Sequence, residues 1–327
     1  MRIAFLLPGQ GSQHARMAVG LYRHEPVFTL AMDSVFAALG KDGDLLRADW
    51  LADQPIVPLD DVTRSQPLLF AVDYALGRTV MSWGVQPDAL LGHSVGEVAA
   101  GTLAGVFSVA DAAGFLWERV LQLAATPPGG MLAVAASAAE LEPFLTPDVV
   151  IAAVNAPRQT LLAGPDRCLA NSADALRASG IRCRRVSSRT AFHSPLVAAA
   201  ASEAEAALRA ITLRPPELPI LSGYTAALMT AAEATDPRFW AGQPAAPVLF
   251  WPALDALLSL GDYLLVETGP GQGLSSLARR HAAVLGGDSA AIAMLPAGPG
   301  EERADRAAAK SAADRLRAMA AAAGAGT

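Results

Sequence analysis

The chain has 327 residues and a net charge of −6, and 52% of its residues are hydrophobic. This length suits one large domain with a smaller one, and the acidic balance excludes non-specific binding to nucleic acid. No window of about 18 uninterrupted apolar residues is present, so we expect no membrane-spanning segment. Cys168 and Cys183 fit neither a disulfide framework nor a metal site. With no signal peptide recognisable at the N-terminus, we expect a cytoplasmic protein.

The first 128 residues predict alternating strands and helices. An apolar run over residues 2–8 stops at a proline and a glycine, which is typical of a buried parallel strand. Ser108 is placed to cap a helix that begins just after it. The remaining pattern predicts a strand at 87–94 and helices at 14–40, 63–84, 95–106 and 108–126.

From Gly129 the pattern changes to shorter elements. Residues 129–194 predict the order β-α-β-β-α-β, which is the ferredoxin-like arrangement and can close as a small independent sheet. After it we expect a helix at 195–210, a strand in 218–226, a helix in 247–261 and a strand in 262–271. We therefore predict a large α/β body from 1–128 and 195–298, a ferredoxin-like subdomain at 129–194, and a C-terminal helix with a flexible tail at 299–327.

One short segment indicates chemistry. "GHSVG" at 92–96 places Ser94 between glycines, after a predicted strand and before a predicted helix. This is the setting of a nucleophile elbow in an α/β-hydrolase-like body, where the helix N-terminus favours an oxyanion. The plain alternative is a small residue at an ordinary strand–helix turn.

A serine nucleophile needs a base, and the chain has five histidines. His93 neighbours Ser94, and side chains one residue apart diverge, so it is expected to line the pocket wall. His24 and His281 are expected on the surface, and His14 could line a site. His193 remains the best base, because it lies where the small subdomain returns the chain to the main body, a natural cleft.

Four segments in this order carry a resemblance to a known family: "PGQGSQ" at 8–13, "GHSVGE" at 92–97, "AFHSP" at 191–195 and "ETGPGQGL" at 267–274. Together they resemble malonyl-CoA:acyl carrier protein transacylases and the acyltransferase domains of modular polyketide synthases. Residues 154–165 and 236–250 look more like the polyketide-synthase branch.

The resemblance implies a Ser–His dyad. Ser94 would carry the acyl group as an ester and His193 would be its base, oriented by a backbone carbonyl near Gly271–Gly273. The backbone N–H groups of Gln10 and Val95 would form the oxyanion hole.

The resemblance also implies how the acyl group is recognised. Arg119, on a predicted helix, would bind the free carboxylate of a malonyl-type group through its planar fork of donors. The alternative is a solvated arginine paired with a nearby acid, Glu118 or Asp111. Gln66 and Asn155 are further pocket candidates. Phe192, in an AFHS-type motif, would favour malonyl over methylmalonyl, although Thr190 replaces the commoner histidine of that motif.

The implied partner is an acyl carrier protein, which is acidic, so docking needs a local basic face. We expect it at five arginines: Arg184, Arg185, Arg189, Arg279 and Arg280. Solvated arginines at a sheet edge are the alternative. We expect a monomer with no metal and no cofactor, for which coenzyme A thioesters are substrates.

The sequence therefore predicts a discrete, trans-acting acyltransferase of polyketide or antibiotic biosynthesis. Three alternatives stay open at this point. The first is a proofreading acyl hydrolase, which Arg119 disfavours. The second is an enzyme that moves an unusual acyl or aminoacyl chain between carrier proteins. The third is a catalytically dead docking subunit, which the intact Ser94 and His193 disfavour.

Overall fold

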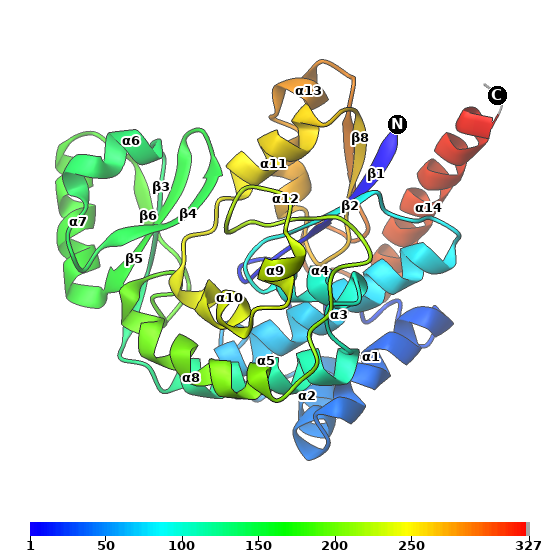
Figure 1. Ribbon diagram of the computed structural model, residues 1–327, viewed down its shortest axis with the longest axis horizontal. Coiled ribbons are helices and arrows are strands. Elements are labelled where there is room, and N and C mark those ends of the chain that lie inside the picture. The colour runs from blue at the N-terminus through cyan, green and yellow to red at the C-terminus, as the bar shows by residue number, and fades with distance from the viewer. Residues whose placement is uncertain (325–327) are drawn as a thin grey trace.

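A five-stranded parallel sheet lies at the centre of the larger part of the molecule in the computed structural model, which describes residues 1–324 (Figure 1). Its strand order is β7-β2-β1-β8-β9. The strands are β1 (Arg2–Leu7), β2 (Ala89–Gly92), β7 (Ile220–Leu221), β8 (Tyr263–Glu267) and β9 (Ala290–Ala293). Successive residues of β1 face opposite sides, so Phe5 and Leu7 join one core and Ala4 and Leu6 the other. The buried first strand is confirmed.

Helices cover both faces of this sheet, and its strands are accordingly largely apolar. α3, α4 and α5 contribute to one core, and α11 and α12 to the other. The helices of the larger part are α1 (Pro26–Ala38), α2 (Lys41–Leu51), α3 (Val62–Ser82), α4 (Gly96–Leu103), α5 (Val109–Ala124), α8 (Ala198–Arg209), α9 (Ala231–Ala234), α10 (Pro237–Gly242), α11 (Phe250–Ser259), α12 (Gly273–Ala278), α13 (Ala282–Leu285) and α14 (Glu302–Gly324). Short 3₁₀ turns lie at Pro195–Val197 and Gln243–Ala245.

The first predicted helix is wrong over its first half. Residues 15–24 form a series of turns, and α1 begins only at Pro26. Arg16, Ala18 and Arg23 have φ values of 56°, 62° and 78°, which an α-helix cannot contain. Ser108 does cap α5, because its side chain accepts a hydrogen bond from the backbone N–H of Asp111.

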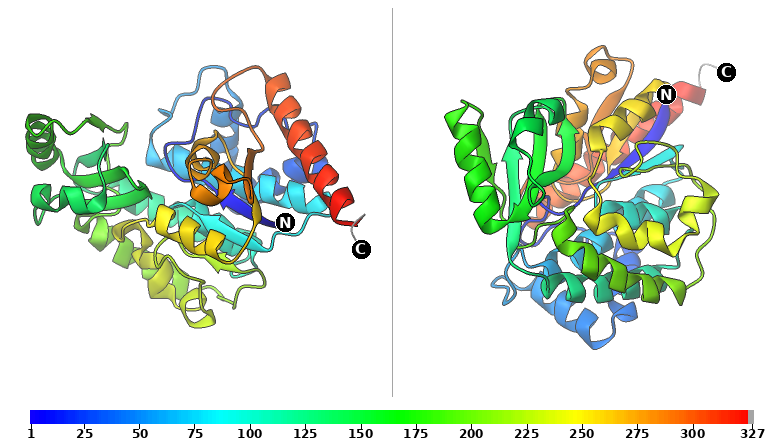
Figure 2. Two further views of the ribbon diagram at one scale, coloured as in Figure 1. Left: turned by 90° about the horizontal axis from the view of Figure 1, so that it is seen from above. Right: turned by 60° about the vertical axis from the view of Figure 1, so that its left-hand side comes forward.

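The smaller part is an antiparallel sheet of order β4-β5-β3-β6, seen at the left of Figure 1 and at the edge of both views in Figure 2. With the strands numbered along the chain this is the ferredoxin-like order, and α6 and α7 occupy the two expected connections. Its elements are β3 (Gly129–Val134), α6 (Ala138–Leu141), a 3₁₀ turn (Glu142–Phe144), β4 (Val150–Ala156), β5 (Gln159–Pro165), α7 (Asp166–Ala178) and β6 (Cys183–Arg185). The predicted fold class is confirmed.

The C-terminal helix α14 packs against the larger part. The carboxylate of Asp305 accepts a hydrogen bond of 3.0 Å from the backbone N–H of Gly20, and Glu302 pairs with Arg16 at 2.6 Å. Leu316 on the same helix is buried in the main core. The flexible tail expected after this helix falls on residues 325–327, which lie outside the described part of the chain.

Candidate active site

Ser94 lies on a sharp turn between β2 and α4. Its φ is 54°, in the left-handed region, where a non-glycine residue costs about 1–3 kcal/mol. The flanking residues must be glycines because backbone atoms approach both positions closely. A Cβ on Gly92 would lie 2.3 Å from the backbone of Glu97, and one on Gly96 would lie 2.1 Å from the carbonyl oxygen of Leu7. The turn therefore exposes the serine hydroxyl at the end of the sheet.

His193 contacts Ser94 although the two residues are far apart in the sequence. Its Nε2 lies 2.9 Å from Ser94 Oγ, although 99 residues separate the two. His193 also has a left-handed φ, of 60°, so both members of the pair are held in uncommon backbone conformations. Such strain is typical of functional sites that the surrounding structure fixes firmly.

The groups that orient His193 differ from the prediction. Its Nδ1 lies 2.8 Å from the carbonyl oxygen of Ala246 and 3.2 Å from that of Gln243, both in the turn after α10. An N–H at Nδ1 donates to these carbonyls, so Nε2 is left to accept the serine proton. The expected carbonyl near Gly271–Gly273 is wrong. That loop approaches Ser12, leads into α12 and lines the cleft that also contains Gln10 and His93.

The electrostatic setting keeps the imidazole neutral. Burial lowers the pKa of His193 to about 4, and the nearby His93 and Arg119 act in the same direction, against the two carbonyl hydrogen bonds. Burial also lowers the pKa of His93. A neutral His193 at physiological pH is the form that can take a proton from a serine.

Two backbone N–H groups are available for an oxyanion. Val95 directly precedes α4, and Gln10 follows β1 in the loop that closes over Ser94. Within residues 1–324, neither N–H donates a hydrogen bond to another group. Gly9 permits this approach, because a Cβ there would lie 2.4 Å from the carbonyl oxygen of His93. The positive end of α4 points to the same place.

Most of the predicted pocket residues come together in one small cavity of about 50 Å³. It is lined by Gln10, Gln66, His93, Ser94, Phe192 and His193. Met131, Ala153 and Leu161 from the strands of the smaller part, and Val186 just after β6, complete the lining. The amide of Gln66 donates to Gln10 Oε1 at 3.2 Å. His93 Nε2 lies 2.8 Å from Asn155 Oδ1, so Asn155 reaches the site by holding His93.

Arg119 lies on α5 and is buried, with 3% of its surface exposed. No hydrogen bond or ion pair to its guanidinium is found in the described part of the chain, and its Nε is buried without a partner. The alternative pairing with Asp111 or Glu118 is therefore absent, since Asp111 bonds to Ser108. Burial lowers the pKa of Arg119 to about 10, and the group stays charged. A buried, unpaired cation is a site for an anion.

The family model of the acyl transferase domain matches residues 4–293 of the chain. The chain belongs to the acyltransferase domain family. A phenolphthiocerol/phthiocerol polyketide synthase polypeptide of Mycobacterium tuberculosis is 37% identical over 280 residues, which cover 86% of this chain and 19% of that polypeptide. The chain thus spans about a fifth of the length of the first curated relatives that it matches.

Solved acyltransferases share the fold. The acyltransferase domain from the second module of the salinomycin polyketide synthase is 34% identical with a TM-score of 0.86, over 95% of this chain and 72% of that one. FabD from Acinetobacter baumannii, at 23% identity and a TM-score of 0.86, covers 97% of this chain and 99% of its own. At that identity the second likeness shows the fold alone.

Two larger clefts open from the catalytic pocket of this acyltransferase domain. One, of about 590 Å³, runs from Gln10 and His93 past Gln159 to Arg280. It continues into an open groove of about 410 Å³ lined by Arg158, Arg182, Arg184 and Arg280. The other cleft, of about 510 Å³, lies beyond Phe192 and is lined by Arg189, Asp60 and Asp61.

The predicted docking arginines therefore do not form one face. Arg184 and Arg280 share the basic groove, whereas Arg189 lies in the other cleft. Arg185 pairs with Asp166, and Arg279 donates to the carbonyl of Ala291. The sequence prediction missed Arg158, which lines the groove together with Arg182 of the basic segment at 182–189.

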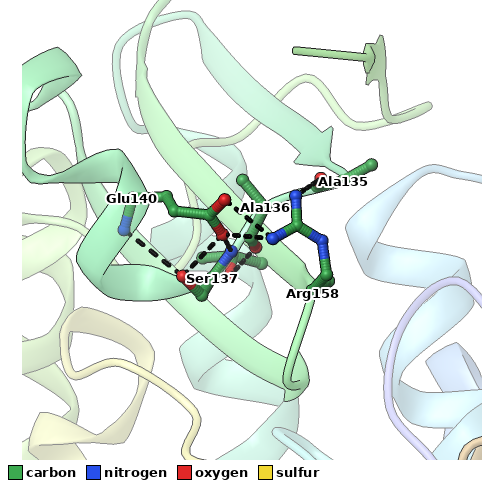
Figure 3. Close-up of polar contacts among 6 residues, drawn as sticks. Ala135, Ala136, Ser137, Glu140 and Arg158 are labelled. Carbon is green, nitrogen blue, oxygen red and sulfur yellow. Dashed lines mark hydrogen bonds and ion pairs between the residues drawn. The ribbon is translucent and has the colours of Figure 1, made fainter.

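Arg158 is fixed in place at the β4–β5 turn, as Figure 3 shows. It pairs with the carboxylate of Glu140 at 2.7 Å and donates to the carbonyl of Ala135 at 3.4 Å. Glu140 also closes a capping box with Ser137 at the start of α6, and these hydrogen bonds lower its pKa to about 2. Arg158 therefore lies at the rim of the groove with part of its charge offset by Glu140.

The remaining histidines are placed as follows. His24 is exposed, as expected, and His14 lines the larger cleft. The surface position expected for His281 is wrong: it is buried, caps α13 by accepting from Ala283 N–H, and bonds to Asp255 at 3.0 Å.

Three polar residues around the site were not predicted. Glu97 is fully buried and accepts hydrogen bonds from Ser222 Oγ and Gly223 N–H, both at 2.7 Å, and burial raises its pKa to about 8. Tyr224 follows in the same loop. Asp73 on α3 is buried against Gly269 with no hydrogen-bond partner among residues 1–324, and burial raises its pKa well above the usual value.

No three His, Cys, Asp or Glu side chains of the described residues are grouped as metal ligands. In that same part of the chain, no helix has the length and apolar character needed to cross a membrane.

Proposed function

We propose that this acyltransferase domain moves a malonyl-type acyl group from coenzyme A to the phosphopantetheine thiol of an acyl carrier protein, through an ester on Ser94. The observation that carries the proposal is Arg119, a buried and unpaired guanidinium that is close enough to act electrostatically on His193. A guanidinium binds a carboxylate through two parallel hydrogen bonds. An acetyl group has no free carboxylate and cannot form these hydrogen bonds.

In the first half-reaction, Ser94 Oγ attacks the thioester carbonyl carbon while its proton passes to His193 Nε2, 2.9 Å away. The negative charge on the former carbonyl oxygen is stabilised by the N–H groups of Gln10 and Val95. The C–S bond then breaks, and His193 gives its proton to the departing coenzyme A thiolate. This leaves a malonyl ester on Ser94.

The second half-reaction reverses the roles. The carrier thiol gives its proton to His193 and attacks the ester carbonyl, and the proton returns to Ser94 Oγ as the C–O bond breaks. The backbone carbonyls of Gln243 and Ala246 keep the imidazole in the tautomer that both steps require.

The size of the catalytic pocket supports a small acyl group. A volume of about 50 Å³ beside Ser94 leaves little room, and Phe192 forms part of the wall. We propose a preference for malonyl over methylmalonyl, of a size set by one methyl group, about 1–3 kcal/mol.

We further propose that the carrier approaches the basic groove. Arg184 and Arg280 are exposed there, and the groove is continuous with the cleft that reaches Gln10 and His93. Such a route gives an acidic carrier a complementary surface and gives its arm a path to Ser94. Reversal of charge at Arg184 and Arg280 should raise the KM for carrier, more at low than at high salt.

The test is the intact mass of the protein after incubation with malonyl-, methylmalonyl- and acetyl-CoA, with and without a separate carrier protein. We expect a malonyl adduct that is absent in Ser94→Ala and that moves to the carrier when it is added. Absence of any malonyl adduct on the wild type would overturn the proposal. An adduct that decays equally fast without carrier would indicate a hydrolase instead.

A further inference from the structure

Tyr224 lies against the catalytic pair, in the loop that follows β7. The centroid of its ring is 6.1 Å from that of the His193 imidazole. The Ser94 hydroxyl and Arg119 both contribute to the electrostatic environment of Tyr224. Tyr224 therefore lies where the nucleophile, the base and the unpaired cation meet.

The loop that carries Tyr224 is rigidly held by α4. Ser222 Oγ and Gly223 N–H both donate to the buried carboxyl group of Glu97 at 2.7 Å. The backbone N–H of Tyr224 then donates to Ser222 Oγ at 3.1 Å, and the carbonyl of Gly223 accepts from Leu249 N–H. Since Glu97 is three residues after Ser94, the same helix that begins at the nucleophile also fixes the position of the tyrosine.

The chemistry of the phenol suits a donor role. Burial raises the pKa of Tyr224, and its hydroxyl stays protonated. A protonated phenol can donate a hydrogen bond to an acceptor on the substrate.

We propose that Tyr224 is a specificity-determining residue, whose hydroxyl donates a hydrogen bond to the free carboxylate of the acyl group that Arg119 binds. This inference rests on the proposed function. A carboxylate has about four lone-pair sites, and a guanidinium fork uses two of them, so acceptor capacity remains for a phenol. Together the two residues would recognise both the charge and the position of the carboxylate.

The test is Tyr224→Phe, which removes one oxygen atom and keeps the ring. We expect the single-turnover rate of Ser94 acylation by malonyl-CoA to fall about tenfold or more, the typical loss for a hydrogen bond to a charged group. The rate with acetyl-CoA should change less than about threefold. The matched control is Tyr22→Phe, which removes another tyrosine hydroxyl, bonded to Asp33, and should leave the malonyl-to-acetyl ratio unchanged.

An equal fall with both thioesters, or an unchanged malonyl rate, would overturn the assignment. A second measurement tests binding without acyl transfer. In the Ser94→Ala background, Tyr224→Phe should raise the Kd for malonyl-CoA but not the Kd for acetyl-CoA. Equal changes in the two Kd values would refute the role. If the wild type forms no malonyl adduct, the proposed function itself fails. If the wild type loads malonyl and Tyr224→Phe loads it equally well, only this inference fails.

Discussion

Replacement of Arg119 by methionine should separate stability from activity. Arg119 is 3% exposed and lies 5.2 Å from the ring centroid of Phe115, but no acid within residues 1–324 pairs with it, so its buried charge has no counter-ion. An apolar side chain of similar length removes this cost. From comparable replacements we expect the free energy of unfolding to rise by about 1–3 kcal/mol. In a protein of this size each kcal/mol raises the Tm by roughly 2–4 °C.

The same substitution should abolish selection for a carboxylate. Two charge-assisted hydrogen bonds are each worth about 1.5–3 kcal/mol, so kcat/KM for malonyl-CoA should fall by about 100-fold or more. The value for acetyl-CoA should stay within about threefold. Differential scanning calorimetry measures the change in stability, and discontinuous thioester assays measure kcat/KM on the same preparations.

Arg64→Met is the control for burial of an arginine. Arg64 is equally buried, but it pairs with Asp49, so its loss leaves that carboxylate without its cation and should lower the Tm. The reasoning would be refuted if Arg119→Met lowered the Tm as Arg64→Met does, or if it slowed malonyl and acetyl loading equally.

Three further outcomes are expected. In urea titrations, Gly92→Ala should lower the free energy of unfolding by about 2 kcal/mol or more, because its Cβ would meet the backbone of Glu97. Gly114→Ala on α5, where nothing lies within 4 Å, should leave the free energy of unfolding unchanged or raise it. Leu316→Ala on α14 should cost about 2–4 kcal/mol, and the exposed Arg315→Ala less than about 0.5 kcal/mol; equal effects would show that α14 does not support the core. His193 has a pKa of about 4 when folded and about 6.5 when unfolded, so below pH 6.5 the unfolded chain binds the extra proton and stability falls as the pH drops toward 4. Between pH 7.5 and pH 5 the wild type should lose about 2 kcal/mol more than His193→Gln, and an identical loss would contradict the lowered pKa.

The residues that could be predicted from the sequence are those whose role only one residue type can fill. "GHSVG" required glycine at two positions because backbone atoms approach within 2.3 Å of where a Cβ would stand, and only glycine satisfies this. Five histidines left few candidates for a base, so His193 could be chosen by elimination. The alternating elements of residues 129–185 likewise predicted an antiparallel sheet whose order the structure confirms.

What the sequence did not predict depends on backbone atoms and on tertiary context. The acceptors for His193 Nδ1 are the carbonyls of Gln243 and Ala246, and any residue supplies a carbonyl. The turns at 15–24 place Arg16 and Ala18 at positive φ, a conformation that neither residue favours by itself. Tyr224 belongs to no pattern that marks a pocket. Its position comes from Glu97, more than a hundred residues earlier in the chain.

On the proposed function, the charge of Arg119 acts on the rate as well as on the choice of substrate. With no acyl group bound, this charge helps to lower the pKa of His193 and so weakens the base. A bound carboxylate would neutralise Arg119 and remove that effect. The imidazolium that forms when Ser94 gives up its proton would then be stabilised more than in an acetyl complex, where Arg119 stays unpaired. The buried cation would therefore favour the dicarboxylic group in the transition state beyond its binding, which is the form of discrimination that raises kcat/KM.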